Sequence, residues 1–209
     1  MLVENKQATS TYKPIPAGMH LARCFMYVDV GHQETKFGDK HQILLYFEIH
    51  SEDPNTGEPL VTTNGDPMAI FKKYTLSWNE AAILRKDLES WRGAAFSPEE
   101  QKRFDIKNIL DKWCMLNITN NPDKNDPNKI WDNIQSITPV PAQIKKLGLP
   151  EGVNDLKGFE LDKFSQEAFD QLPAFAKNRI TKSSEWTKLN GKADTMKSSY
   201  DDMNDPIPF

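Results

Sequence analysis

The segment Asp201–Phe209 carries the most distinctive chemistry in the sequence. It reads DDMNDPIPF, so three aspartates precede Ile207 and Phe209, and two prolines fix φ and remove backbone donors. Such a segment cannot join a packed core, but it offers negative charge, one aliphatic and one aromatic side chain. That combination suits a hydrophobic pocket with a basic rim on another protein. The alternative is a solubilising polar segment, which does not account for its two large apolar residues.

A second group of residues could bind single-stranded nucleic acid, because aromatic rings stack on bases and ammonium groups meet phosphates. If residues 68–78 form a strand with Ile70 and Tyr74 facing inward, Phe71 and Lys73 face outward together. Aromatic residues on strands often belong to the core, and a register error of one residue exchanges the two faces. The candidates on predicted strands and loops are Arg23, Tyr27, Lys36, Phe37, Lys40, Tyr46, Phe71, Lys73, Lys124, Lys129 and Trp131.

Residue patterns typical of enzymes do not occur in the sequence. The histidines lack close ligand spacing, and Cys24 and Cys114 have no nearby Cys or His partner. No Walker loop, GxSxG or HExxH motif is present. We therefore expect no catalytic residue, no metal and no cofactor. A metal-dependent nuclease that uses Glu48, Glu52 and Asp53 stays open as the least favoured alternative.

The overall charge of the chain limits how it could bind DNA. The 209 residues carry a net charge of −4 and a mean hydropathy of −0.65. Residues 191–209 contribute four acidic and two basic side chains, so the remainder is still at −2. Any DNA contact must therefore come from a local patch. No apolar run reaches the roughly 18 residues of a membrane span, and the first residues lack a signal-peptide core, so we expect a cytoplasmic protein.

The hydrophobic pattern predicts five strands and two helices. The strands are expected at 18–30, 41–50, 68–78, 113–120 and 130–140, with a hairpin loop at 31–40 and turn-rich loops at 51–68 and 121–129. Strand 41–50 alternates, so Ile43, Leu45, Phe47 and Ile49 are expected inward and Leu44, Tyr46 and His50 outward. In strand 68–78, Leu76 is also expected inward. Helices are predicted at 79–93, between Asn79 as cap and Gly93 as stop, and at 97–104. The second begins with a capping box, in which Ser97 is the cap and Glu100 follows three residues later.

Three strands, a helical insertion and two further strands are the element order of the OB-fold, a five-stranded, partly open barrel. We therefore predict a mainly β protein with this fold, and a generic α+β sheet is the competing arrangement. The predicted divisions are a flexible lead-in at 1–16, the barrel at 17–140, a helical appendage packed on the barrel at 141–186, and a disordered acidic tail at 187–209. In an OB-fold the second and third strands form the binding face, flanked by the loops after the first and fourth strands.

Several segments resemble a known family. DDMNDPIPF resembles the C-terminal tip of bacterial and phage single-stranded-DNA-binding proteins, although Met203 and Asn204 interrupt its acids and Pro206 is extra. YKPIPAGMHLARC, FKKYTLSW and LRKDLESWRGAAF are similar to segments of such proteins from bacteriophages and integrative elements. The resemblance implies that the tip recruits other proteins through Asp201, Asp202, Asp205, Ile207, Pro208 and Phe209.

The resemblance also implies a function without catalysis. The protein would coat single-stranded DNA without strong sequence preference during phage replication and recombination. Its tip would recruit a nuclease, annealing protein, helicase or primase, and a homo-oligomer is compatible with this role. An OB-like protein-interaction module without DNA binding is the main alternative, because the body of the chain is net negative.

Overall fold

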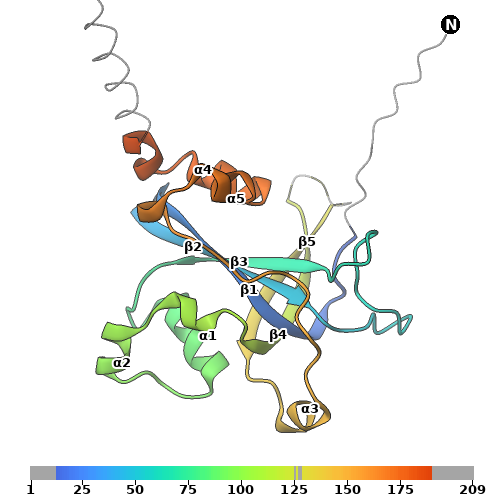
Figure 1. Cartoon of the computed structure of the whole chain (residues 1–209). Helices are drawn as coiled ribbons and strands as arrows, with labels where there is room; N and C mark the ends of the chain where they lie inside the picture. The colour runs from blue at the N-terminus through green and yellow to red at the C-terminus, as the bar shows by residue number, and fades with distance from the viewer. Residues whose placement is uncertain (1–12, 125, 127–128, 190–209) are drawn as a thin grey trace, which may run out of the picture.

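The computed structural model describes residues 13–124, 126 and 129–189. The protein is mainly β, with one sheet of six strands and helices on both of its faces (Figure 1). Within the described residues no helix is both long and apolar enough to cross a membrane. The predicted tip, from Asp201 to Phe209, and most of the predicted lead-in lie outside the described residues.

Five strands form a continuous antiparallel path. Their order in the sheet is β3-β2-β1-β4-β5, so the long first strand pairs with β2 on one side and β4 on the other. A sixth strand, which the sequence did not predict, pairs with β1 in parallel. The strands are β1 (Gly18–Thr35), β2 (Gly38–Ile49), β3 (Ala69–Thr75), β4 (Trp113–Pro122), β5 (Ile130–Thr138) and β6 (Lys157–Phe159).

The hairpin predicted at 31–40 is confirmed, but its loop is much shorter than expected, because β1 and β2 continue into this segment. Gly31, read in the sequence as a loop signal, adopts φ 70° at a register shift within the strand pair. The turn is confined to Lys36 and Phe37, and Gly38 supplies the positive φ of 86° that closes it. The Thr35 hydroxyl donates to the Gly38 carbonyl at 2.7 Å. The hairpin therefore projects Phe37 from its tip.

The main core lies between one face of the sheet and the helices that follow β3. These are α1 (Ile83–Arg92), α2 (Pro98–Arg103) and the 3₁₀ helix η1 (Ile106–Ile109). The four inward residues predicted on the second strand are buried here, as are Ile70 and Tyr74, but Leu76 is 43% exposed and its prediction was wrong. Helix α1 is bounded by Ala82 and Gly93, not by Asn79, whereas the capping box at Ser97 and Glu100 is confirmed.

The opposite face of the sheet is also buried. A second core covers it and contains Phe25, Met26, Val28, Val30, Leu44, Tyr46, Phe159, Leu161, Phe169, Leu172, Ala176 and Ile180. Its cover is the C-terminal appendage, which comprises β6, η2 (Leu161–Lys163), α4 (Gln166–Asp170) and α5 (Ala174–Ile180). In Figure 1, α4 and α5 lie on one side of the sheet and α1 and α2 on the other. Helix α3 (Ala142–Leu147) contributes no residue to either core.

The chain enters the main core before β1 begins. Ile15 is buried, its amide donates to an Asp132 carboxylate oxygen at 2.8 Å, and its carbonyl accepts from the Asn120 side chain at 2.9 Å. The lead-in predicted for residues 1–16 therefore ends before Ile15.

A buried ion pair joins the sheet to the start of the appendage. Arg23 on β1 donates from Nε to the Glu48 carboxylate on β2 at 2.7 Å, and Glu48 is fully buried. The same carboxylate accepts from the backbone amides of Val153 and Asn154, at 3.1 and 2.8 Å, and from the Asn154 side chain at 2.6 Å. Arg23 Nη2 donates in turn to the Asn154 carbonyl at 2.6 Å.

The Arg23 side chain also binds a second loop, and it leaves room for no residue but glycine at one neighbouring position. Arg23 Nη1 donates at 2.9 Å to Asp111, which lies between η1 and β4 and has a φ of 63°. A Cβ added to Gly152 would lie 1.8 Å from the Arg23 guanidinium carbon, so only glycine fits this approach. Burial alone would raise the pKa of Glu48, but the bonds from Arg23, Asn154 and His50 lower it from an ordinary 4.5 to about 2.

We predict that Glu48→Gln lowers the free energy of unfolding by about 3–5 kcal/mol at neutral pH, because it removes the buried counter-charge of Arg23 and leaves it only the exposed carboxylate of Asp111. The folded pKa of Glu48 is depressed, so its stabilisation is present above pH 4.5 and disappears as the pH falls toward 2. The stability difference between wild type and variant should shrink over that interval in urea titrations followed by circular dichroism. Glu80→Gln, at an exposed position, is the matched control. Equal pH profiles for wild type and Glu48→Gln would contradict the assignment.

Candidate nucleic-acid interface

Three of the predicted DNA-contacting side chains lie inside the protein. Arg23, Tyr27 and Tyr46 are 6%, 3% and 6% exposed, so none of them can contact DNA as the chain is folded here, and the expectation that Tyr46 faces outward is wrong. Arg23 is held by Glu48, and Tyr46 lies beneath the appendage. For Tyr27 the cause is the register shift between Cys24 and Met26, which places it with Ala22 in the main core.

Phe71 belongs to a row of aromatic rings that the appendage covers. Across β1, β2 and β3 the rings of Phe25, Tyr46 and Phe71 follow one another, with centroids 6.4 and 5.3 Å apart. Phe175 on α5 packs on Phe71 at 4.7 Å. The row borders a cavity of about 580 Å³ whose far wall includes Asn154. The predicted binding face therefore exists as an aromatic surface, but a helix lies on it.

The tip of the β1–β2 hairpin presents a second aromatic surface that is open. Phe37 is 74% exposed, and the Lys36 ammonium lies 4.8 Å from its ring centroid. Phe37 also borders a groove of about 770 Å³ together with Lys40 and Lys73, which is exposed on β3. Thr75, Ser77 and Asn79 add polar groups to the groove wall. Four of the predicted residues are thus brought together here.

The β4–β5 hairpin carries a similar pair. Trp131 is 45% exposed, and the Lys129 ammonium lies 4.2 Å from its ring centroid. The indole Nε1 donates to Asp123 at 2.7 Å, which fixes the ring relative to the hairpin. Lys124 is exposed on the same connection. This tip is at the opposite end of β1 from Phe37, because β4 runs antiparallel to β1 from Arg23 towards Gly18.

The local charge at the β1–β2 tip is positive despite the acidic balance of the chain. Lys36, Lys40 and Lys73 outnumber Glu34 and Asp39, which face each other across the hairpin. The next acidic groups along the strands are already engaged: Asp29 lies 2.7 Å from His41, and this contact raises the pKa of His41. The tip can therefore attract a polyanion without a basic domain.

The acidic residues that the nuclease alternative would use do not form a metal site among the described residues. Glu48 is fully engaged by Arg23 and Asn154, while Glu52 is exposed in the loop after β2. Among the described residues no group of three or more His, Cys, Asp or Glu side chains could hold a metal ion. Cys24 and Cys114 are buried free thiols, and burial raises the pKa of each.

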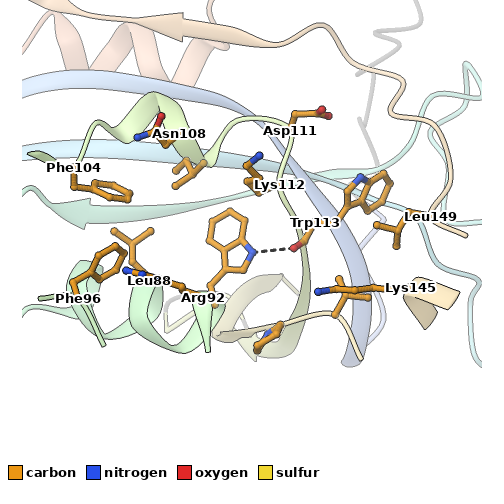
Figure 2. Close-up of a pocket in the computed structure, with 14 residues that line it drawn as sticks. Leu88, Arg92, Phe96, Phe104, Asn108, Asp111, Lys112, Trp113, Lys145 and Leu149 are labelled. Atoms are coloured by element: carbon orange, nitrogen blue, oxygen red, sulfur yellow. Dashed lines mark hydrogen bonds between the residues drawn. The ribbon is translucent and has the colours of Figure 1, made fainter. Parts of the chain in front are cut away.

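One further pocket was not predicted from the sequence. It lies between α1, η1, the start of β4 and the segment around α3, and Figure 2 shows its aromatic and basic side chains. The helical spacing of Leu88 and Trp91 was recognised, but the pocket also requires Phe96, Phe104 and Trp113 from separate segments. No pattern in one segment could indicate that convergence.

The sequence comparisons find no relative: no protein-family model matches this chain, and no curated protein matches it.

We predict opposite effects from removing two buried tyrosine hydroxyls. The Tyr46 hydroxyl has no hydrogen-bond partner among the described residues, whereas that of Tyr27 donates to Glu160 at 2.7 Å. Tyr27→Phe should lower the free energy of unfolding by about 0.5–1.5 kcal/mol, and Tyr46→Phe should leave it unchanged or raise it. Urea denaturation measures both, each variant serving as the other's control. A larger loss for Tyr46→Phe than for Tyr27→Phe would contradict the described environment of Tyr46.

Proposed function

We propose that this protein binds single-stranded DNA through the exposed tips of its two hairpins. The observation that carries the proposal is the pair of solvent-exposed rings, Phe37 and Trp131, each with a lysine ammonium within 5 Å of its centroid. An aromatic ring with an adjacent cation is the element from which sequence-tolerant single-strand binding is built, because every base has a π-face and every nucleotide a phosphate. The β2–β3 face, where the sequence predicted binding, is under the appendage.

The sheet topology supports an OB-type barrel as the scaffold. β1 is shared between β2 and β4, which leaves β3 and β5 as the two edges. Helix α1 contacts both edges: the Ser90 hydroxyl donates to the Ile137 carbonyl on β5, and Asp87 accepts from Tyr74 on β3. A helix between the third and fourth strands that closes the gap between the barrel edges is the OB arrangement.

Affinity in this proposal comes more from stacking than from charge. Stacking contributes roughly 1–3 kcal/mol per base, and the two tips provide two open rings. Five lysines, Lys36, Lys40, Lys73, Lys124 and Lys129, are available for phosphates. If all five neutralise a phosphate, the logarithm of affinity falls with the logarithm of salt concentration with a slope of about −3.5. The net charge of −4 predicts no additional attraction at long range.

A second role is assigned to Asp201–Phe209, which lies outside the described residues. Its sequence supports capture by basic-rimmed hydrophobic pockets of replication or recombination enzymes. The connecting chain would hold such an enzyme at high effective concentration near the coated strand. The proposed protein is therefore a non-catalytic, cytoplasmic DNA-binding protein with a recruiting segment.

Two observations favour a different class of protein. The net negative charge and the covered sheet face would also suit a protein-interaction module of the same architecture. In that case the exposed Phe37 and Trp131 rings would contact a protein.

Titration of a fluorescent oligo-dT without Mg²⁺ tests the proposal. We expect Phe37→Ala and Trp131→Ala each to weaken binding about 5- to 150-fold, which corresponds to the loss of one stacking contact. Leu147→Ala, at a residue 88% exposed on α3, removes a similar apolar surface elsewhere and should leave binding unchanged.

Each other result of the titration has a defined meaning. Absence of binding at low salt would leave the protein-interaction module, and Mg²⁺-dependent loss of the oligonucleotide would leave the nuclease. Binding that neither ring substitution weakens would show that the DNA lies elsewhere on the protein.

A further inference from the structure

The pocket in Figure 2 is an apolar cavity with a volume of about 510 Å³. Its floor is formed by four buried residues, Leu88, Trp91, Ile109 and Val140. The Trp91 indole packs on Phe47 with ring centroids 5.7 Å apart, and its Nε1 donates to the Trp113 carbonyl at 2.9 Å. The main core and β4 therefore hold the floor of the pocket in place.

One wall of the pocket, the aromatic wall, is formed by Phe96 and Phe104. Their ring centroids lie 5.2 Å apart, and the Trp78 ring packs against them at 5.3 and 5.2 Å, all three pairs being T-shaped. Figure 2 shows the aromatic wall at one end of the cavity, and Trp113 and Lys145 at the other. Rings packed in this way give the cavity a fixed shape, and its volume lies within the roughly 300–1,000 Å³ of small-ligand sites.

Two charged groups of the lining are already neutralised by partners in the protein. Arg92 is paired with Glu100, and its guanidinium lies 4.7 Å from the Phe96 ring centroid. Asp111 accepts from the Arg23 guanidinium at 2.9 Å. Each pair offsets its own charge, so neither calls for a ligand of opposite charge.

Two lysines of the lining keep their charge available. Lys112 directly precedes Trp113, and Lys145 lies on α3. Both are exposed, and neither has a carboxylate partner among the described residues. A cavity with an aromatic wall at one end and such cations in its lining complements a ligand that combines an apolar body with a negative charge.

We propose that this pocket binds a small organic acid whose single carboxylate is attached to an aromatic or aliphatic body. The body would lie over Trp91 against the aromatic wall, and the carboxylate would face Lys112 and Lys145. Asp111 also borders the cavity and opposes a multiply charged group, so a carboxylate is favoured over a phosphate.

A strand of nucleic acid would fit the same pocket less well. Its phosphates would approach Asp111, and the side chain of Asn108 is the one uncharged amide in the lining that could bind a base edge. No residue of the lining belongs to the two hairpin tips at which DNA binding is proposed. The inference is therefore independent of the proposed function.

The test uses the full chain and p-benzoylbenzoate, a photoreactive aromatic carboxylate, without DNA. Irradiation followed by mass spectrometry should place its cross-links at residues of the lining, namely Leu88, Phe96, Phe104 or Leu149. Naphthoate and decanoate should each suppress these cross-links. The acid that does so at the lower concentration shows whether the pocket prefers an aromatic or an aliphatic body.

Matched variants test the contribution of the two lysines. Lys112→Gln with Lys145→Gln should weaken binding of p-benzoylbenzoate about 2- to 30-fold, which corresponds to the loss of two exposed ion pairs. Lys86→Gln with Lys182→Gln removes the same charge at exposed residues outside the lining and should leave binding unchanged. The uncharged analogue p-methylbenzophenone should cross-link equally to wild type and to both variants. Circular dichroism confirms that each variant is folded.

Three results would overturn the inference. Cross-links that are absent or that map outside the lining would show that the acid does not bind here. Equal affinity of p-benzoylbenzoate for the two double variants would show that Lys112 and Lys145 do not hold the carboxylate. Suppression of the cross-links by oligo-dT would assign the pocket to DNA. Because Phe37 and Trp131 lie outside the lining, a failure of DNA binding at the hairpin tips leaves this inference intact, and the reverse also holds.

Discussion

The buried Arg23–Glu48 ion pair is the interaction on which the rest of the structure depends. It joins β1 to β2, reaches the loop before β4 through Asp111, and fixes the start of the appendage through the backbone of Asn154. Desolvation of two charges is costly, and only a full set of hydrogen bonds makes such a pair favourable. The Glu48 carboxylate has that set, so its position determines where the chain from Val153 onward must run.

That course of the chain decides which surfaces remain for binding. From Asn154 the appendage continues to β6 beside β1 and then over Tyr46 and Phe71 as α4 and α5. The aromatic row on this face consequently serves packing, and the exposed rings are those at the hairpin tips. In the proposed mode, a strand of DNA would contact the margins of the sheet while the covered face stays closed.

The alternation of β2 was sufficient to predict its main-core residues, and the capping box at Ser97 could be read directly. The other face of β2 was predicted to be exposed, but Leu44 and Tyr46 on it are buried in the second core. Successive residues of β2 enter the two cores in turn, and the sequence of the strand does not show that both of its faces are covered. Tyr27 was misplaced because the register shift after Cys24 leaves no periodic signal. The Arg23–Glu48 pair and the pocket around Trp113 join residues distant in the chain, which local patterns do not indicate. The exposure of Lys36, Phe37, Lys129 and Trp131 could be predicted, because residues in or next to a turn remain exposed whatever lies on the sheet.

Hydrogen–deuterium exchange with and without oligo-dT tests most directly whether the tips or the covered face bind DNA. We predict slower exchange at residues 34–41 and 121–131, with no change at 43–47 beneath the appendage or at 174–180 in α5. Protection of 43–47 together with faster exchange in α5 would contradict it, because that pattern means that DNA displaces the appendage and occupies the face with Tyr46 and Phe71.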